Sequence, residues 1–346
     1  MTTTTIMKSR MLLLLGSLCL FAPLAQAFLA PSIYMAAAVT RRATAMAAGS
    51  SLRMQQAAAT TGIDVPKISF SKYHGIGNDF ILIDNRQSDK PILSAEQCKE
   101  ICSRHYSIGA DGVIFALPGK EGADYSMRIY NSDGSEPEMC GNGIRCMAKF
   151  LRQLEGDDRN GESRSYRIYT LAGMVVPVVR GDGLVTVDMG TPILDGAKVP
   201  TTLPAGPDGR VVEAPLEVTT VSMGNPHAVI FVPFLDPVDL AKVGPQIEVH
   251  PVFPKKTNVE FVQVVAPHLL RMKVWERGAG PTLACGTGAC ALTVAAILAG
   301  KTDKREVTVQ LPGGDLQIEW RKSDDHVYMT GAAELVYGGT IGALGK

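Results

Sequence analysis

One short segment occurs twice in this chain, once in each half. Cys140-Gly141-Asn142-Gly143-Ile144-Arg145-Cys146 returns in degenerate form as Cys285-Gly286-Thr287-Gly288-Ala289-Cys290. Each copy stands directly before an apolar run typical of a helix, Met147 to Leu154 and Ala291 to Leu298. A Cys-Gly-x-Gly segment that leads into a helix leaves backbone N–H groups unpaired at the positive end of the helix dipole. Such a position binds a carboxylate and is expected to lower the pKa of a thiol.

The N-terminal region has a composition of its own. From Met1 to Ile63 there is no Asp or Glu, whereas the 34 basic and 34 acidic residues of the whole chain balance. The remainder therefore carries a mild excess of acid, which argues against a nucleic-acid partner.

We interpret this region as a targeting presequence of two parts. Lys8 and Arg10 precede the apolar run Met11 to Leu24, and Ala25-Gln26-Ala27 follows as a signal-peptide cleavage pattern. The run is too short for a membrane anchor, the alternative interpretation. The tract 28–62, which begins at Phe28 and is rich in Ala, Ser, Thr, Arg and Met, is typical of a transit peptide. Together the parts resemble the bipartite presequence of algal plastids bounded by extra membranes, so we expect a chloroplast stroma location. A signal peptide acting alone would instead lead to secretion and paired cysteines.

The remaining cysteines do not form a zinc pattern. Cys98 and Cys102, Cys140 and Cys146, and Cys285 and Cys290 are separated by three, five and four residues, not by the two of zinc ribbons. No metal motif, P-loop or dinucleotide fingerprint is present, so we expect no metal and no cofactor. We expect Cys98, Cys102, Cys146 and Cys290 to be buried packing residues.

The order of predicted elements favours an α+β fold of two similar halves. A helix with a capping box at Ser94-x-x-Gln97 is predicted over 94–105. Strands are predicted in the first half at 68–73, 81–84, 125–131, 166–170, 173–179 and 184–189, with a turn and then a strand within 108–116. In the second half they are predicted at 217–222, 228–232, 259–265, 271–276, 307–311, 316–320 and 326–330. The Pro- and Gly-rich segment 190–215 is the predicted linker. The helix starts of the two halves are expected to meet at a small-molecule site.

Two thiols on opposite faces of one carbon can invert it. One, as thiolate, removes the α-hydrogen, and the other, as thiol, supplies a hydrogen from behind. Because the α-hydrogen is much less acidic than a thiol, most of the barrier has to be lowered by stabilising the enolate-like carboxylate, to which one well-placed donor contributes about 3–4 kcal/mol. A buried thiol pair or an inter-half disulfide is the structural alternative for Cys140 and Cys285.

From about Lys67 to the C-terminus the chain resembles the diaminopimelate epimerase family. The resemblance rests on six segments, which are His74-Gly75-Ile76-Gly77-Asn78-Asp79-Phe80, Asn131-Ser132-Asp133-Gly134-Ser135, Met139-Cys140-Gly141-Asn142-Gly143-Ile144-Arg145-Cys146, Gly224-Asn225-Pro226-His227, Thr257-Asn258-Val259, and Glu276-Arg277-Gly278-Ala279-Gly280 with Ala284-Cys285-Gly286-Thr287-Gly288. Each is weak alone, but their order is specific.

The resemblance implies an isomerase of lysine biosynthesis that interconverts LL- and meso-diaminopimelate without a cofactor. It implies two like domains, 66–189 with the returning tail 331–346, and 190–330, each a strand-rich, barrel-like sheet around a central helix with the active site between them. The partner is the small-molecule substrate, the mature form needs no membrane, and a homodimer is left open.

The family's site residues carry over onto this sequence. The catalytic thiols are Cys140 and Cys285, with His227 and Glu276 modulating their pKa. The implied substrate-binding residues are Asn78, Asn131, Gly141, Asn142, Asn225, Asn258, Glu276, Arg277, Gly286 and Thr287. The sequence departs from many bacterial members at Gly112, where they have Gln.

Two alternatives remain. A proline or hydroxyproline racemase would share the architecture, but a cyclic substrate has no distal zwitterion for Glu276 and Arg277 to hold. A non-catalytic amino-acid-binding module would not need both cysteines.

Overall fold

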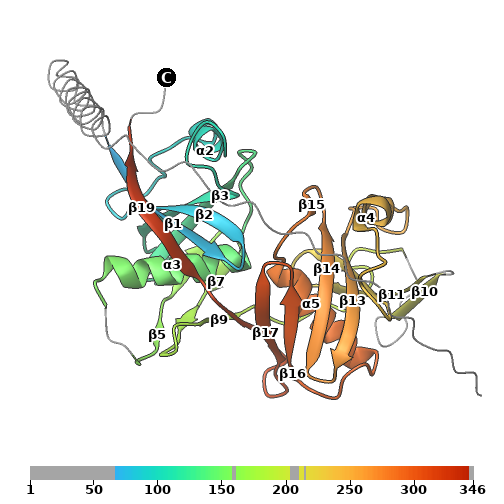
Figure 1. Cartoon of the computed structure of the whole chain (residues 1–346). Coiled ribbons are helices and arrows are strands. Elements are labelled where there is room, and N and C mark those ends of the chain that lie inside the picture. Colours follow the sequence, from blue (N-terminus) through green and yellow to red (C-terminus); the bar gives the residue numbers. More distant parts are fainter. Residues whose placement is uncertain (1–66, 158–160, 203–209, 214–215, 343–346) are drawn as a thin grey trace, which may run out of the picture. The chain divides into compact units, whose positions relative to one another are not determined.

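The computed structural model describes residues 67–157, 161–202, 210–213 and 216–342 (Figure 1). The predicted presequence, 1–62, lies outside these residues. Residues from Val65 onward form one compact unit, built from two sheets and their helices.

The first sheet has seven strands in the order β19-β1-β2-β3-β4-β6-β7. Their bounds are β1 Ile68–Gly75, β2 Asn78–Asp84, β3 Gly112–Pro118, β4 Tyr125–Asn131, β6 Ile168–Thr170, β7 Gly173–Val175 and β19 Glu334–Ile341. Strand β19 comes last in the chain and pairs antiparallel with β1, the first strand. The C-terminal segment therefore returns to the sheet in which the described chain begins.

Helices cover both faces of this sheet, as the alternation of its side chains requires. Phe80, Leu82 and Ile114 pack with α3 (Gly141–Leu154), whereas Ile81 and Val113 pack with α2 (Ala95–Ile101). Helix α2 begins with the predicted capping box at Ser94, and its Cys98 and Cys102 are buried as expected. In Figure 1, α3 is the green helix beside β1 and β2.

The second sheet has the order β10-β11-β12-β13-β14-β16-β17-β18-β9-β8-β5, and β15 pairs with β14. The bounds are β5 Arg164–Ser165, β8 Val178–Val179, β9 Val185–Asp188, β10 Arg210–Glu213, β11 Leu216–Ser222, β12 Pro226–Phe231, β13 Asn258–Ala266, β14 Leu269–Glu276, β15 Gly280–Pro281, β16 Glu306–Leu311, β17 Gly314–Trp320 and β18 Val327–Gly331. Strand β9 pairs with β18, so this sheet continues across residue 190 into the first half of the sequence.

The second sheet is also covered on both faces. Val229 and Val262 face α5 (Gly286–Leu298), and the intervening Ala228 and Phe261 pack with residues of α4 (Leu240–Glu248). Helix α4 was not predicted. The helix begins at the N-cap Asp239, but it contains Gly244 and Pro245, two residue types that are unfavourable inside helices and argue against a helix in the sequence.

The α+β, sheet-rich architecture is confirmed, and nearly every predicted strand is present. The barrel-like expectation needs one correction, because the hydrogen-bonded order of both sheets runs between open ends in the described residues. Among those residues, no helix is both long and apolar enough to cross a membrane.

Candidate active site

The first cysteine segment forms the start of α3. Cys140 is the N-cap residue, with an extended backbone (φ −139°), and the Gly143 N–H donates to its sulfur at 3.4 Å. The Cys140 thiol donates to Asn78 Oδ1 at 3.9 Å. Cys140 is half-buried, whereas Cys146 is fully buried in the helix, as predicted. The sulfur thus replaces the usual Ser or Asp oxygen at the helix start.

The second cysteine segment forms the start of α5, but its cysteine side chain makes no capping hydrogen bond. Cys285 is the N-cap residue, with an extended backbone (φ −122°), and it is buried. Its sulfur lies 3.7 Å from Thr287 Oγ1, and Cys290 is fully buried, as predicted. All six described cysteines are free, so the disulfide alternative for Cys140 and Cys285 is not what the structure shows.

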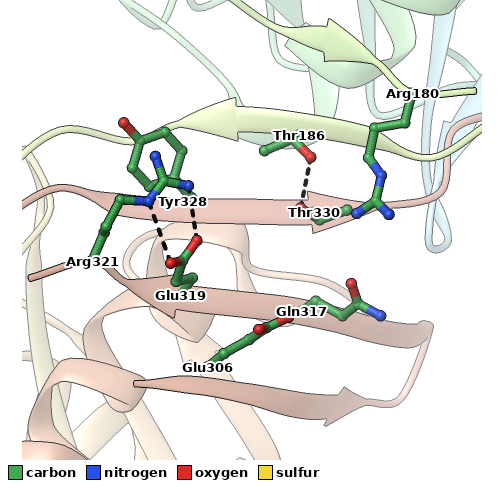
Figure 2. A pocket seen from close by; sticks show the side chains of 8 residues that line it. All are labelled: Arg180, Thr186, Glu306, Gln317, Glu319, Arg321, Tyr328 and Thr330. Atoms are coloured by element: carbon green, nitrogen blue, oxygen red, sulfur yellow. Dashed lines mark hydrogen bonds and ion pairs between the residues drawn. The ribbon is translucent and has the colours of Figure 1, made fainter. Parts of the chain in front are cut away.

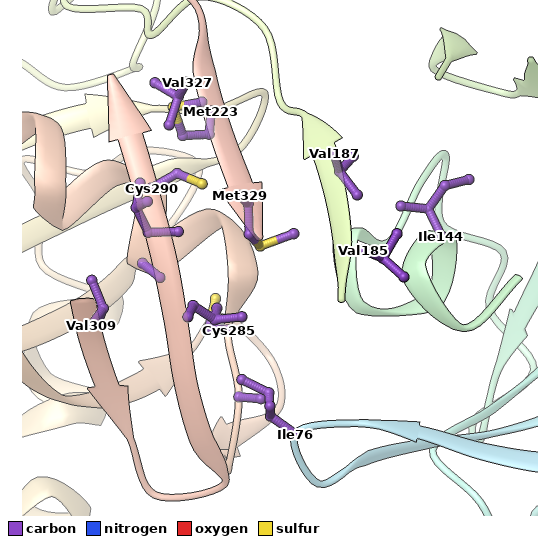
Figure 3. Packing of buried hydrophobic residues seen from close by; sticks show 14 of the residues in the cluster. Ile76, Ile144, Val185, Val187, Met223, Cys285, Cys290, Val309, Val327 and Met329 are labelled. Carbon is purple, nitrogen blue, oxygen red and sulfur yellow. The ribbon is translucent and has the colours of Figure 1, made fainter. Parts of the chain in front are cut away.

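The two helix starts contact each other, as expected. Asn142 in the first turn of α3 donates to the carbonyl of Ala284, the residue before Cys285, at 3.3 Å. Gly141 and Gly286 both lie against the thioether of Met329, and a Cβ added to either would come within 2.9 Å of it. A larger residue at either position would require the end of the Met329 side chain to move. Figure 3 shows Met329 and Cys285 in the hydrophobic cluster at this junction.

The pKa of each thiol departs from the expected direction. Burial raises the pKa of Cys140, although the N–H groups of Gly143 and Asn142 and the Arg145 charge oppose it. The pKa of Cys285 is raised well above its usual range by burial and by the carboxylates of Glu276 and Glu260. The expectation of a lowered thiol pKa is therefore wrong for this state of the protein. Desolvation of the thiolate outweighs the helix N–H groups.

Asn78 is positioned beside Cys140 by an ionic network. Its Nδ2 donates to Asp111 Oδ2 at 2.7 Å, which leaves Oδ1 to accept from Asn142 Nδ2 at 3.1 Å. Arg104 bridges Asp79 and Asp111, and Lys72 lies 2.7 Å from Asp79. The sequence places Asn78 in a turn, and the structure makes it the first residue of β2.

A second chain of hydrogen bonds leads to Cys285. Asn225 Nδ2 donates to Thr287 Oγ1 at 3.2 Å, and Asn225 Oδ1 lies 3.0 Å from His227 Nε2. His227 Nδ1 lies 2.6 Å from Glu260 Oε1, and both side chains are fully buried. Three of the predicted residues, Asn225, His227 and Thr287, are thus brought together with Cys285.

The segment after β14 lies against the same helix start. Glu276 accepts a hydrogen bond from Thr282, and burial raises its pKa. The negative charge of Glu276 raises the pKa of both Cys140 and Cys285. The Arg277 side chain is exposed and donates to Lys255 O at 3.2 Å. Gly278 and Ala279 are exposed as well.

Asn258 and Asn131 are engaged differently from the other predicted asparagines. Asn258 Nδ2 donates to Pro226 O at 2.8 Å, and Asn258 Oδ1 accepts from the Arg277 N–H at 2.9 Å. The nitrogen and the oxygen of the side-chain amide are therefore both bonded to backbone groups. Asn131 ends β4 and donates to Ser135 Oγ at 3.0 Å, and within the described chain its side chain has no hydrogen bond to another predicted site residue. Beside it, Gly112 begins β3, and a Cβ there would lie 2.7 Å from Tyr130 O. A glutamine at this position would require the strand to shift.

Two residues of this region were missed by the sequence analysis. Glu260 follows Asn258 on the same face of β13, where Val262 continues the apolar series, and that alternation could have identified an inward carboxylate. Arg145 is fully buried in α3. It donates to the carbonyls of Gly141 and Ala332 and contacts Met329 Sδ at 3.4 Å, and it forms no ion pair within the described part of the chain.

A polar pocket on the second sheet is separate from these residues. It has a volume of about 150 Å³ and is lined by Arg180, Thr186, Glu306, Gln317, Glu319, Arg321, Tyr328 and Thr330. Figure 2 shows that its polar groups partly satisfy each other, as in the Arg321–Glu319 pair at 2.8 Å and the Thr186–Thr330 bond at 2.8 Å. None of the predicted site residues lines it.

Comparison with solved structures shows a shared fold. The PhzF-family phenazine biosynthesis protein of Bacillus anthracis aligns over 80% of this chain and 99% of its own, with a TM-score of 0.59 and 18% identity. A hydroxyproline epimerase from Agrobacterium vitis aligns over 80% of this chain and 91% of its own, with a TM-score of 0.56 and 15% identity.

Sequence comparison is more specific. The family model described as "Diaminopimelate epimerase" matches residues 70–194 and 219–336. The diaminopimelate epimerase of Microcystis aeruginosa is 59% identical over 280 residues, which cover 79% of this chain and 98% of that protein. That of Synechococcus elongatus is 59% identical over 281 residues, with the same coverage. The chain belongs to the diaminopimelate epimerase family.

Proposed function

We propose that this protein is an isomerase that interconverts LL- and meso-diaminopimelate in lysine biosynthesis, with Cys140 and Cys285 as its acid and base. The observation that carries the proposal is the direct contact between two helix starts, each headed by a cysteine. An α-carbon placed between them would have one sulfur on each face. In one direction Cys140 removes the proton and Cys285 supplies one, and in the other the roles are exchanged.

The N–H groups at the helix starts would hold the substrate's reacting carboxylate. Gly141 and Asn142 supply them from α3, and Gly286 and Thr287 supply them from α5. These donors face the oxygens on which negative charge grows as the α-proton leaves. One such donor contributes about 3–4 kcal/mol to the transition state. Since burial raises the pKa of both thiols, this stabilisation is what makes the proton transfer feasible.

The remaining predicted residues would fix the rest of the substrate. We assign Asn78, Asn131 and Asn225 to its amino and carboxylate groups, and Glu276 with Arg277 to the distal zwitterion. Asn258 would act mainly by holding the Arg277 backbone, because both ends of its amide already bond backbone groups. This distal pair favours diaminopimelate over proline or hydroxyproline, whose epimerases share only the fold.

The test is epimerisation of LL-diaminopimelate in D₂O by wild type and by the variants Cys140→Ser and Cys285→Ser. Wild type is expected to form meso-diaminopimelate with deuterium at the α-carbon, and each variant to lose about 10²- to 10⁴-fold in rate. Cys290→Ala, a buried cysteine on the same helix as Cys285, is the matched control and should keep its activity. Normal epimerisation by either serine variant would remove the two-thiol mechanism. Wild type that binds the substrate without exchange would be a binding module, and exchange into proline would favour the racemase alternative.

We also propose that the protein acts in the plastid stroma, after removal of a presequence over residues 1–62. Support comes from the acid-free composition of that region, from the family model, which matches from residue 70, and from cyanobacterial relatives that cover 79% of this chain. Residues 1–62 fused to a fluorescent protein should direct it into plastids, and the fusion of 1–27 alone should stop in the secretory pathway. Retention of the first fusion in the cytosol would contradict the proposal.

For the domain division we propose 66–189 with 331–346, and 190–330. The pairing of β19 with β1 supports the first domain, although the β9–β18 pairing ties the two together. Limited proteolysis should cut first within 190–215 and leave two fragments that stay associated. Early cleavage inside either domain would argue against these bounds.

A further inference from the structure

A carboxylate lies on the apolar face that the second sheet presents to α5. Strands β12 and β13 run parallel, with His227 opposite Asn258 and Val229 opposite Glu260. His227, Val229, Glu260 and Val262 therefore share one face, and the two valines pack in the core with α5. Glu260 is fully buried there, and its Oε2 has no hydrogen-bond partner among the described residues. Because burial of a charge is costly unless its position serves a purpose, this carboxylate requires an explanation.

The carboxylate and the Cys285 thiol lie on either side of one glycine. A Cβ at Gly288 would lie 2.8 Å from Glu260 Oε1 and 3.1 Å from Cys285 Sγ. No side chain can separate the two groups, and both lie at the first turn of α5. The N–H groups of that turn provide a positive potential for an anion.

Glu260 is also the far end of the hydrogen-bond chain that reaches Cys285. With Asn225 Nδ2 donating to Thr287 Oγ1, Asn225 Oδ1 faces His227 Nε2, so that nitrogen carries a hydrogen. The Thr287 oxygen accepts from Asn225 and can direct its own hydrogen toward Cys285 Sγ, 3.7 Å away. The Glu260 carboxylate accepts from His227 Nδ1 at 2.6 Å, so both ring nitrogens donate, and the carboxylate pairs with an imidazolium that it holds in place.

We propose that Glu260 is a positioning residue for the thiol of Cys285: its negative charge favours the protonated thiol, and its bond to His227 directs the Asn225–Thr287 chain toward the sulfur. The inference rests on the proposed epimerase function, in which Cys285 delivers a proton in one direction. Glu260 is fully buried, so we assign it no contact with the substrate.

The other charges near the two thiols are distributed differently. The charge of Glu276 on β14 raises the pKa of Cys285, as that of Glu260 does. His227 on β12 contacts Glu260, and its charge lowers the pKa of Glu276. The charge of Arg145 on α3 lowers the pKa of Cys140, Cys146 and Cys290, against the effect of burial. Glu260 is thus expected to affect Cys285 and to leave Cys140 unaffected.

The test follows the alkylation of each cysteine by iodoacetamide as a function of pH, read by peptide mass spectrometry without substrate. Glu260→Gln keeps the shape of the side chain and removes its charge. We expect the pH midpoint for Cys285 to fall by about one unit, so that alkylation below the midpoint is about tenfold faster, with the midpoint for Cys140 unchanged. Better access alone would raise the rate at every pH without moving the midpoint.

The matched control is Glu155→Gln. Glu155 accepts from Tyr125 and Tyr166 at 2.8 and 3.1 Å, and it caps the opposite end of α3 from Cys140. This control should move neither midpoint. An unmoved Cys285 midpoint in Glu260→Gln, or equal shifts of both cysteines, would overturn the proposal.

A second variant keeps the test decisive if Glu260→Gln does not fold. Thr287→Val removes the last hydroxyl of the chain, and Thr287 is only partly buried. Loss of a donor to the thiolate should raise the Cys285 midpoint, the opposite direction, and no shift would overturn the chain of hydrogen bonds. Because these readouts involve no substrate, they stand apart from the epimerisation assay, whose failure in wild type would instead refute the proposed function.

Discussion

The two cysteine-headed helix starts have the same backbone and different electrostatic surroundings. Cys140 and Cys285 are both N-cap residues with extended backbones, followed by glycine. Around Cys140 the charge that lowers its pKa is the buried guanidinium of Arg145, whereas around Cys285 the carboxylates of Glu276 and Glu260 raise its pKa. A duplicated motif therefore supplies two thiols, and the residues around it make them unequal.

This difference has a simple consequence for a reaction that runs both ways. One thiol has to be ionised while the other carries a proton, and two identical sites would leave that choice to chance. Glu276 raises the pKa of both thiols, and at Cys140 its effect is larger than the opposing effect of Arg145. Because Cys285 has the Glu260 carboxylate in addition and Cys140 has Arg145 as a partial offset, the pair is biased toward a Cys140 thiolate and a Cys285 thiol.

The largest expected effect tests whether the two sites act as one. Asn142→Ala removes the side-chain bond to Asn78 Oδ1 within the first site and the bond to Ala284 O, which links the two sites. The backbone N–H of residue 142 remains, so the expected loss of about 10²-fold in kcat/KM would come from misplacement of the two helix starts. Asn85→Ala is the control, because Asn85 is a buried asparagine whose side chain, within the described residues, bonds only backbone groups nearby in sequence. It should lower stability without lowering kcat, and equal kinetic losses in the two variants would contradict the link.

The next effect concerns the ionic network of Asp79, Arg104 and Lys72, which positions the strand that carries Asn78. Burial tends to raise the pKa of Asp79, but hydrogen bonds from Arg104 and Lys72 outweigh it and lower the pKa to about 2 from 3.8. A lowered carboxyl pKa gives stability that is present above 3.8 and lost as pH falls toward 2, about 2 kcal/mol at neutral pH.

Asp79→Asn should therefore lower the free energy of unfolding at pH 7 by at least that amount, since it also leaves the buried Lys72 unpaired. Urea titrations at pH 7 and pH 3 provide the measurement. The difference between variant and wild type should shrink at the lower pH. A difference that does not depend on pH would show that packing, not the ion network, holds the Asn78 strand.

A smaller effect tests the cation at the first site. Arg145→Met fills the same buried space without the charge, so the pKa of Cys140 should rise further and the rate at pH 7 should fall by about tenfold. The loss should shrink as pH rises, because the missing charge matters less once the thiol ionises. Arg152→Met on the same helix should leave the pH–rate profile unchanged. A loss in Arg145→Met that is equal at every pH would assign Arg145 a purely structural role.

Much of this architecture could be predicted because it depends on residues that are close together in the sequence. The capping box at Ser94, the alternating strands and the Cys-Gly-x-Gly helix starts each follow from short-range chemistry, and the order of family segments identifies the site residues. Helix α4 was missed because Pro245 breaks the pattern that identifies helices. The sheet partnership of β9 with β18 joins residues far apart in sequence, and no local pattern reports it.

The unequal surroundings of the two thiols were the least predictable feature. Arg145 stands inside the repeated segment itself, yet its burial depends on Met329 and Ala332, which follow far along the chain. The raised thiol pKa values have the same origin, since the sequence shows a helix start but not how completely the fold excludes water from it.

The distribution of deuterium early in the reaction tests the central claim most directly. With two thiols on opposite faces of the α-carbon, LL-diaminopimelate in D₂O should give meso product that carries deuterium, while the recovered LL substrate stays unlabelled in the first turnovers. A single thiol serving both faces would return deuterium, or the original hydrogen, to substrate and product alike. Early labelling of recovered substrate to the same extent as product would contradict the account.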